Sequence, residues 1–280
     1  MRVLTFGAAI LGVLLATAAA RAADDGKIVT DRPDAVESSD TVGRGRFQIE
    51  TSFAREWTRK DQATGLRRVS TSTPTLLRFG IVDDIELRIE TNGRIRTSLR
   101  GDGDAELVKG WADAAIGLKW KQQDGDIGTG RPDIAWLVHA DLASGSRTVR
   151  GNGLRPSVRM VAEFDMPEAV AIGVMPGVTW DKRTDGKREV SGILAVVVGK
   201  EWSDKVRTFA EIALPRIATA RNGGNVALLN LGIDYWIEKH VKVDLSIQRG
   251  LNRNTPDWGG RGWFLDQVLT DPRGPRQPRA

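Results

Sequence analysis

Apolar and polar side chains alternate at every second position in segments spread along the whole chain. The clearest segment, 240–250, places one set on each face: Val241, Val243, Leu245 and Ile247 against Lys242, Asp244, Ser246 and Gln248. The alternation recurs in 46–53 and 84–94 and around Leu118, Val138 and Met160. A two-residue period predicts β-strands with one apolar face. The opposite face of these strands carries charges.

Strand length separates two folds that would both show this alternation. A soluble β-sandwich has strands of about five or six residues, whereas about 9–11 residues cross a bilayer at a tilt. The alternating segments span about nine to thirteen residues, and their twelve centres are Ile49, Thr75, Leu87, Leu118, Val138, Met160, Val174, Val196, Ala210, Leu231, Leu245 and Phe264. The pattern therefore predicts an all-β fold, a single antiparallel up-and-down transmembrane β-barrel of about 12 strands.

The connections between the predicted strands alternate between short and long. Four are tight: Val82-Asp83, Met166-Pro167, Ser203-Asp204 and Glu238-Lys239. Three are predicted to be long loops: 95–110, 143–153 and 251–259. A bacterial barrel with an even number of strands has short turns at its periplasmic end and long loops outside. Only the connection 122–130 is longer than this rule predicts for a periplasmic turn.

Tryptophans occur near the ends of the predicted strands. The chain has nine, and eight of them lie in such positions: Trp57, Trp111, Trp120, Trp180, Trp202, Trp236, Trp258 and Trp263. Aromatic rings prefer the boundary between water and lipid. Large aromatics also flank ordinary strands, and tyrosine, which is common in such girdles, occurs once, at Tyr235. The distribution favours a membrane barrel without deciding the question.

The first residues are typical of an export signal. Arg2 precedes an apolar run over 3–16, and Ala20-Arg21-Ala22 provides a small-residue cleavage site. The run is shorter than the roughly 20 residues of a membrane helix. We therefore expect a signal peptide over residues 1–22, cleaved after Ala22, and a protein exported to the outer membrane of a Gram-negative cell.

The rest of the chain shows no linker between differently composed halves, which favours one domain. The polar segment 23–44 precedes the first strand and is expected to be either a periplasmic leader or a plug inside the lumen. The barrel is expected over residues 45–270. Residues 271–280 contain three prolines, which cannot donate to a strand ladder, so a disordered C-terminal tail is predicted there.

Composition and charge exclude several classes of protein. Cysteine is absent, which excludes thiolate metal sites and cysteine nucleophiles and favours closure by a hydrogen-bonded ladder. The formal charge of +5 falls by two when Arg2 and Arg21 leave with the signal peptide. Lysine and arginine alternate with aspartate and glutamate, so no basic face for nucleic acid is expected.

Short motifs carry a resemblance to a known family. They lie, in order, at 30–34 (TDRPD), 37–38 (ES), 42–50 (VGRGRFQIE), 73–80 (TPTLLRFG), 85–88 (IELR), 113–119 (DAAIGLK), 209–211 (FAE) and 244–252 (DLSIQRGLN). Together they resemble the outer-membrane "transporter" family assigned to the MetA pathway of phenol degradation. The resemblance implies an exported barrel linked to uptake of aromatic or hydrophobic compounds. The chain departs from such barrels at its end, because their last strand usually finishes on an aromatic residue that the assembly machinery recognises.

The charged faces of the strands are predicted to line the lumen. A Lys or Arg that faces lipid at mid-bilayer costs about 2–4 kcal/mol. The lumen-lining candidates are Glu50, Glu86, Arg88, Glu90, Asp113, Lys119, His139, Asp141, Arg159, Glu163, Arg207, Glu211, Asp234, Lys242 and Asp244. Barrels of about eight strands are filled by side chains and those of about sixteen leave a wide channel, so an ionic, narrow, gated or partly plugged pore is expected.

Passive passage of small solutes is the function that this pattern favours. A closed barrel with a structural or adhesive role is the alternative, and Arg100-Gly101-Asp102 is a weak adhesive signal. A barrel lipid hydrolase is disfavoured, because the two histidines, His139 and His240, have no nearby Gly-x-Ser-x-Gly motif.

The expected partners follow from the predicted place of the protein in the cell. They are outer-membrane lipid and lipopolysaccharide, small-molecule solutes and the outer-membrane assembly machinery, but not nucleic acid. No cofactor and no metal is expected, because the acidic segment 100–106 lacks the full calcium-binding loop and its closing glutamate.

Overall fold

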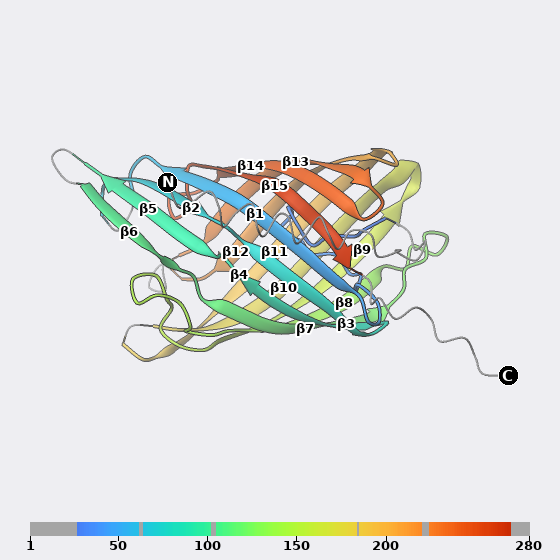
Figure 1. Cartoon of the computed structure of the whole chain (residues 1–280), viewed down its shortest axis with the longest axis horizontal. Coiled ribbons are helices and arrows are strands. Elements are labelled where there is room, and N and C mark those ends of the chain that lie inside the picture. Colours follow the sequence, from blue (N-terminus) through green and yellow to red (C-terminus); the bar gives the residue numbers. More distant parts are fainter. Residues whose placement is uncertain (1–26, 62–63, 102–104, 184, 220–223, 270–280) are drawn as a thin grey trace.

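The structure is a computed structural model that describes residues 27–269 except 62–63, 102–104, 184 and 220–223, and only the backbone of 263–269. Fifteen described strands form one antiparallel sheet, which closes into a barrel because β15 pairs with β1 (Figure 1). They are β1 (Phe47–Thr58), β2 (Arg67–Ser72), β3 (Thr75–Val82), β4 (Ile85–Thr91), β5 (Arg94–Arg100), β6 (Ala105–Trp111), β7 (Ala114–Gln123), β8 (Asp133–Asp141), β9 (Arg155–Met166), β10 (Val170–Lys182), β11 (Arg188–Ser203), β12 (Val206–Ile217), β13 (Val226–Glu238), β14 (Val241–Gly250) and β15 (Trp258–Leu269). A short 3-10 turn, η1 (Pro167–Ala169), joins β9 to β10.

Three breaks divide long strands in two, so the fifteen segments make twelve wall strands. β2 and β3 both pair with β1, and the break between them contains Pro74, which lacks a ladder donor. β4 and β5 continue one another across 92–93, as do β6 and β7 across 112–113. With each pair counted once, the predicted twelve-strand antiparallel barrel is confirmed, and every predicted centre lies in a different wall strand.

The connections follow the predicted order with one exception. The four tight turns lie after β3, β9, β11 and β13, and long connections join β8 to β9 and β14 to β15. The predicted loop over 95–110 is wrong, because β5 and β6 fill most of it as a hairpin that projects beyond the barrel (Figure 1). A hairpin outside the bilayer has water on both faces, so it needs no apolar face and the alternating pattern does not mark it.

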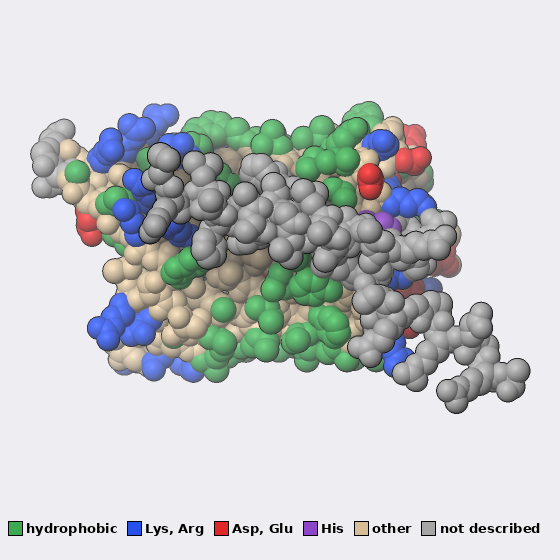
Figure 2. Space-filling view, viewed as in Figure 1, with side chains coloured by type: hydrophobic (Ala, Val, Ile, Leu, Met, Phe, Trp, Pro, Cys, Tyr) green, Lys and Arg blue, Asp and Glu red, His purple; other side chains and the backbone are tan. Residues whose placement is uncertain are grey.

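Alternating side chains divide between the outer and the inner face of the barrel. On β14, Leu245 is 62% exposed on the outside, whereas Lys242 is 2% exposed on the inside. On β7, Leu118 faces out and Lys119 is fully buried. Figure 2 shows hydrophobic side chains over the middle of the wall and lysine and arginine gathered at the end from which β5 and β6 project. The barrel therefore has an apolar belt of the kind that contacts acyl chains.

The predicted tryptophan girdle is correct in part. Trp111 and Trp202, at strand ends, are exposed on the outer surface. Trp236 does not belong to it, because it shares the inward register of Asp234 on β13 and is buried. Its indole nitrogen donates to the carbonyl of Ile28 at 3.1 Å.

Two predicted segments lie outside the described residues: the signal peptide over 1–22 and the tail over 271–280. Across the described part of the chain, no helix has the length and apolar character needed to cross a membrane.

Candidate functional site

Residues 27–44, which we name the lumenal segment, lie inside the barrel. The amide of Ile28 donates to the carbonyl of Lys239 at 2.7 Å, and the amide of Arg44 donates to a carboxylate oxygen of Asp83 at 3.2 Å. Lys239 and Asp83 belong to tight turns, so both ends of the segment lie at the same end of the barrel. Between them, Asp31 is buried inside the barrel against β3, β4 and β7, so the segment enters and leaves the lumen at one end.

Glycines on the inner wall make room for this segment. A Cβ on Gly80 of β3 would lie 1.6 Å from the carbonyl oxygen of Gly43, which is far inside contact distance. A Cβ on Gly173 of β10 would lie 2.9 Å from a methyl group of Val36. The lumenal segment therefore packs closely against the wall at both glycines. A larger residue at Gly80 or Gly173 would displace the segment.

Asp31 is the centre of the ionic contacts between segment and wall. The ammonium of Lys119 donates to its two carboxylate oxygens at 2.8 and 2.9 Å, and Arg88 donates to it as well. The Nε atom of Arg78 lies 3.6 Å from the same carboxylate. All four side chains are almost fully buried, so each charge depends on its partners rather than on water.

Two wall carboxylates complete this central cluster. Glu86 accepts hydrogen bonds from Arg78 Nε at 2.9 Å and from Arg88 at 2.8 Å, and it also accepts the amide of Val42 at 2.9 Å. Glu50 accepts a hydrogen bond from Arg78 at 3.2 Å. The wall thus brings three cations against two carboxylates, and the lumenal segment supplies the missing negative charge.

Glu37 is a second carboxylate that the segment contributes. Its oxygens accept hydrogen bonds from Arg88 and from Arg159, each at 2.6 Å. Burial disfavours its ionised form, but the two guanidinium groups outweigh burial and lower the pKa of Glu37 to about 2. In the same way, Arg78, Lys119 and Arg88 overcome burial and hold the pKa of Asp31 well below its usual range.

A further cluster lies on β12, β13 and β14. Arg207 donates to Asp34 of the lumenal segment at 2.8 Å and to Asp234 at 2.7 Å. Lys242 donates to Asp234 at 3.2 Å and to the carbonyl of Arg32 at 2.8 Å. Burial, only partly offset by Arg207, raises the pKa of Asp34. This cluster binds the segment from β12, β13 and β14, whereas the central cluster binds it from β1, β3, β4 and β7.

Wall carboxylates also bind backbone amides of the segment. Glu211 accepts the amides of Ala35 and Val36 at 2.8 and 2.7 Å. Glu163 accepts the amide of Ser39 at 2.6 Å. A carboxylate that accepts several amides fixes the path of a chain that has no secondary structure of its own.

The fifteen predicted lumen residues all lie on the inner side of the wall, in three groups. The central group is Glu50, Glu86, Arg88, Lys119, Arg159 and Glu163. The group on β12–β14 is Arg207, Glu211, Asp234, Lys242 and Asp244. The group nearer the long loops is Glu90, Asp113, His139 and Asp141.

The sequence predicts an ionic lumen, but one side of the barrel has an apolar inner face. An apolar cluster faces inward from β8 to β12 and packs on Val36: Leu137, Val161, Met175, Ala195, Val197, Phe209 and Ala213. The run 193–198, which is apolar at every position, signals strands with two apolar faces. The lumenal segment covers this inner apolar surface, so water does not contact it.

Several contributors to the lumen were missed from the sequence. Arg78 is charged and flanked by Leu77 and Phe79, so the alternation itself marks it as inward. Asp31 and Glu37 had no such signal, because they precede the first strand and their position depends on the whole barrel. Among the described residues, no group of histidine, aspartate and glutamate side chains could hold a metal ion.

Sequence comparison shows the family. A family profile described as "Putative MetA-pathway of phenol degradation" matches residues 30–263. The chain belongs to this family. The match covers most of the chain, including the lumenal segment from residue 30 and the barrel as far as β15. No sequence among the curated proteins matches the chain.

Solved structures with the same fold are outer-membrane barrels. The COG4313 outer membrane channel from Pseudomonas putida F1 has 11% identity and a TM-score of 0.59, over 85% of this chain and 98% of that one. The β domain of the Bordetella autotransporter BrkA has 11% identity and a TM-score of 0.49, over 78% of this chain and 96% of that one. At 11% identity, the similarity to the COG4313 channel shows the fold alone, that of a transmembrane β-barrel.

Proposed function

We propose that this protein is an outer-membrane channel that passes small solutes passively, with the lumenal segment as its resident plug. The closed barrel, its apolar outer belt and its charged inner wall support a transmembrane passage. The family to which the chain belongs supports small aromatic or hydrophobic compounds as the solutes. The barrel needs no cofactor for this function, because solutes move down their gradient.

One observation carries the proposal: the segment neutralises the wall. Without Asp31 and Glu37, the central wall would hold four cations, Arg78, Arg88, Lys119 and Arg159, against three carboxylates, Glu50, Glu86 and Glu163. Such an imbalance in a low-dielectric passage concentrates anions. A displaced segment would therefore open a path that favours negatively charged solutes, whereas the docked segment keeps the lumen narrow.

Conductance in planar bilayers tests the proposal. The full-length protein is compared with a variant in which residues 30–41 are replaced by a Gly-Ser linker of the same length. We expect a small conductance from the first and a larger, anion-selective conductance from the second, read from the reversal potential in a salt gradient. A refolded variant that is cation-selective, or that conducts no better than the full-length protein, contradicts the plug.

A closed barrel is the second candidate function, and the inner apolar cluster favours it. Val36 belongs to the same buried hydrophobic cluster as Leu137, Val161 and Phe209, which resembles a protein core. If neither protein conducts ions and neither allows solute flux into liposomes, the barrel is a structural one. A lipid hydrolase would instead show lipid turnover that is lost in His139→Ala.

The partners and the location of the protein are part of the same proposal. The exposed apolar belt suits outer-membrane lipid, and the basic end seen in Figure 2 suits the phosphates of lipopolysaccharide. Folding is proposed to depend on the outer-membrane assembly machinery. Export is proposed to follow cleavage after Ala22, which N-terminal sequencing of the protein from isolated outer membranes tests directly.

A further inference from the structure

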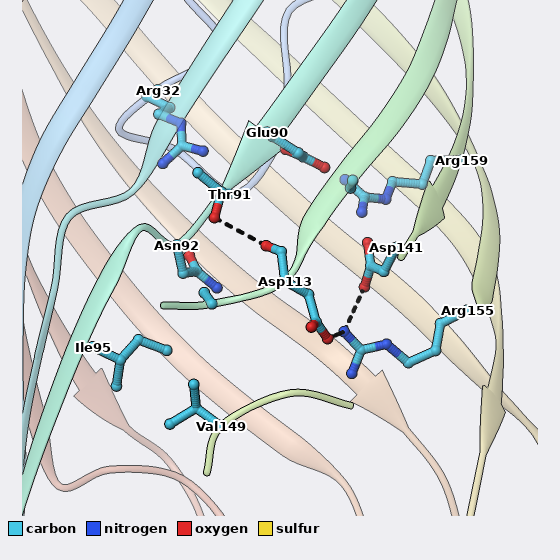
Figure 3. A pocket seen from close by; sticks show the side chains of 12 residues that line it. Arg32, Glu90, Thr91, Asn92, Ile95, Asp113, Asp141, Val149, Arg155 and Arg159 are labelled. Atoms are coloured by element: carbon cyan, nitrogen blue, oxygen red, sulfur yellow. Dashed lines mark hydrogen bonds and ion pairs between the residues drawn. The ribbon is translucent and has the colours of Figure 1, made fainter. Parts of the chain in front are cut away.

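A cavity of about 390 Å³ lies in the lumen beside the strand breaks, on the side of the long loops. Figure 3 shows Arg32 of the lumenal segment, Glu90 of β4 and Arg159 of β9 around its upper part, with Ile95 and Val149 at its lower part. The cavity has the size that small-molecule sites commonly have. It combines a charged side with an apolar side.

The connection between β8 and β9 closes this cavity on the side where β6 leaves the wall. Asp113 holds that connection, because its carboxylate accepts the amides of Gly145 and Gly151 at 2.9 and 2.8 Å. The amide of Ser146 also donates to the carbonyl of Trp111 at 2.9 Å. These hydrogen bonds hold the connection between β8 and β9 in place, and Val149 of this connection lines the cavity.

Three guanidinium groups and three carboxylates line the cavity, and some of the guanidinium donors have no acceptor in the described part of the chain. Arg155 forms salt bridges with both Asp113 and Asp141, at 3.2 and 3.1 Å. The carboxylate of Glu90 lies 3.6 Å from Nδ1 of His139, but this nitrogen has no hydrogen-bond partner among the described residues. Arg159 is paired with Glu37, which lies outside the cavity lining, and its buried Nε has no hydrogen-bond acceptor within the described structure.

Arg32 is the decisive residue. Its guanidinium has neither a hydrogen bond nor an ion pair with any residue that the structure describes, although it lines both this cavity and a neighbouring one of about 170 Å³. The neighbouring cavity is also lined by Arg261, which donates to the carbonyl of Pro33 at 3.3 Å. The unpaired guanidinium of Arg32 and the free Nε of Arg159 offer hydrogen-bond donors to a ligand, and a carboxylate matches the fork of a guanidinium.

We propose that this cavity binds a small monocarboxylate whose apolar body is about the size of one ring. The carboxylate lies on Arg32 and the free side of Arg159, and the apolar body lies against Ile95 and Val149. Because it names a solute class for the proposed channel, this inference rests on that function. Binding and flux are measured separately, so the failure of one does not hide the failure of the other.

Three probes separate the charge from the body. Benzoate has both, acetate has the carboxylate alone, and benzamide has the ring alone. Binding to the full-length protein in detergent at pH 7 is measured by isothermal titration calorimetry. We expect saturable binding of benzoate and at least tenfold weaker binding of acetate and of benzamide, since a charge-assisted hydrogen bond or a buried ring each contributes that much.

A matched pair of variants locates the site. Arg32→Gln removes the unpaired guanidinium, whereas Arg131→Gln removes an exposed one from the connection between β7 and β8, at the opposite end of the barrel. We expect at least a tenfold loss of benzoate affinity in the first and no change in the second. Equal losses in both, equal affinities for all three probes, or no benzoate binding to the unaltered protein would overturn the proposal. Benzoate binding without flux into liposomes would retain the site and reject the channel.

Discussion

Substitution of Asp31 by asparagine tests the plug most directly. The change keeps the shape of the side chain and removes the negative charge to which Lys119 donates at 2.8 and 2.9 Å and to which Arg88 also donates. Lys119 would keep two carbonyl acceptors, Ser38 and Asp40, but its nearest remaining carboxylate oxygen, on Glu86, lies 3.9 Å away. A fully buried ammonium would then lack a close counter-charge.

The size of the effect follows from burial. Removing one partner of a buried ion pair costs about 3–5 kcal/mol, because the remaining charge is left without compensation. Since both side chains are at most 1% exposed, solvent screening does not reduce this figure. In the Asp31→Asn protein, undocking of the lumenal segment should therefore become more favourable by about 10²- to 10⁴-fold.

Asp40→Asn is the matched control in the same segment. Asp40 pairs with Lys121 at 2.8 Å, but its side chain is 42% exposed, so its charge contributes about 0–1 kcal/mol. Single-channel recordings at pH 7 measure the fraction of time spent in the high-conductance state. We expect this fraction to rise steeply in Asp31→Asn and hardly at all in Asp40→Asn. Equal fractions in the two variants would refute the assignment of Asp31 as the anchor of the plug.

Three more outcomes are expected. Docking lowers the pKa of Glu37 from 4.5 to about 2 and also lowers the pKa of Asp31. The two ionised carboxylates therefore stabilise the docked segment fully above pH 4.5, and this stabilisation is lost as the pH falls toward 2. The fraction of time spent in the open state should rise across that pH range. Gly80→Ala should displace the turn over 43–46 and expose it to trypsin, whereas Gly260→Ala, whose Cβ would have 3.8 Å of space, should not; equal digestion would contradict the close fit. Leu245→Arg, on the outer belt, should lower the free energy of unfolding in lipid by about 2–4 kcal/mol, measured by urea titration, and an unchanged midpoint would place Leu245 outside the bilayer.

The barrel could be predicted from the sequence because every strand of its wall repeats the same local pattern of side chains. Each spanning strand needs an apolar residue at every second position, as around Leu118 and Leu245, and the two-residue period survives without knowledge of any partner strand. The hairpin of β5 and β6 escaped prediction, since water on both faces imposes no such rule. The strand break at 112–113 carries no sequence signal either, whereas the break at 92–93 is an Asn-Gly pair, which is a turn signal.

The candidate site could be predicted only in part. The alternation predicts that charges such as those of Lys119 and Asp234 point inward, and both side chains are buried in the structure. Their pairing does not follow, because it depends on which strands curve toward each other and on the path of the lumenal segment. Arg32 shows the limit clearly: its importance lies in having no partner, and only the assembled barrel reveals that.

The re-entrant path of the lumenal segment limits how it can move. Its last residue is followed within three positions by β1, so an undocked segment stays tied to the rim of the barrel. Eighteen residues reach at most about 65 Å when extended, more than enough to hang outside the pore. A tether of this length holds the local concentration of the segment in roughly the millimolar range, so it returns quickly and without help. A free peptide of the same sequence would have to be supplied at a comparable concentration to compete with it.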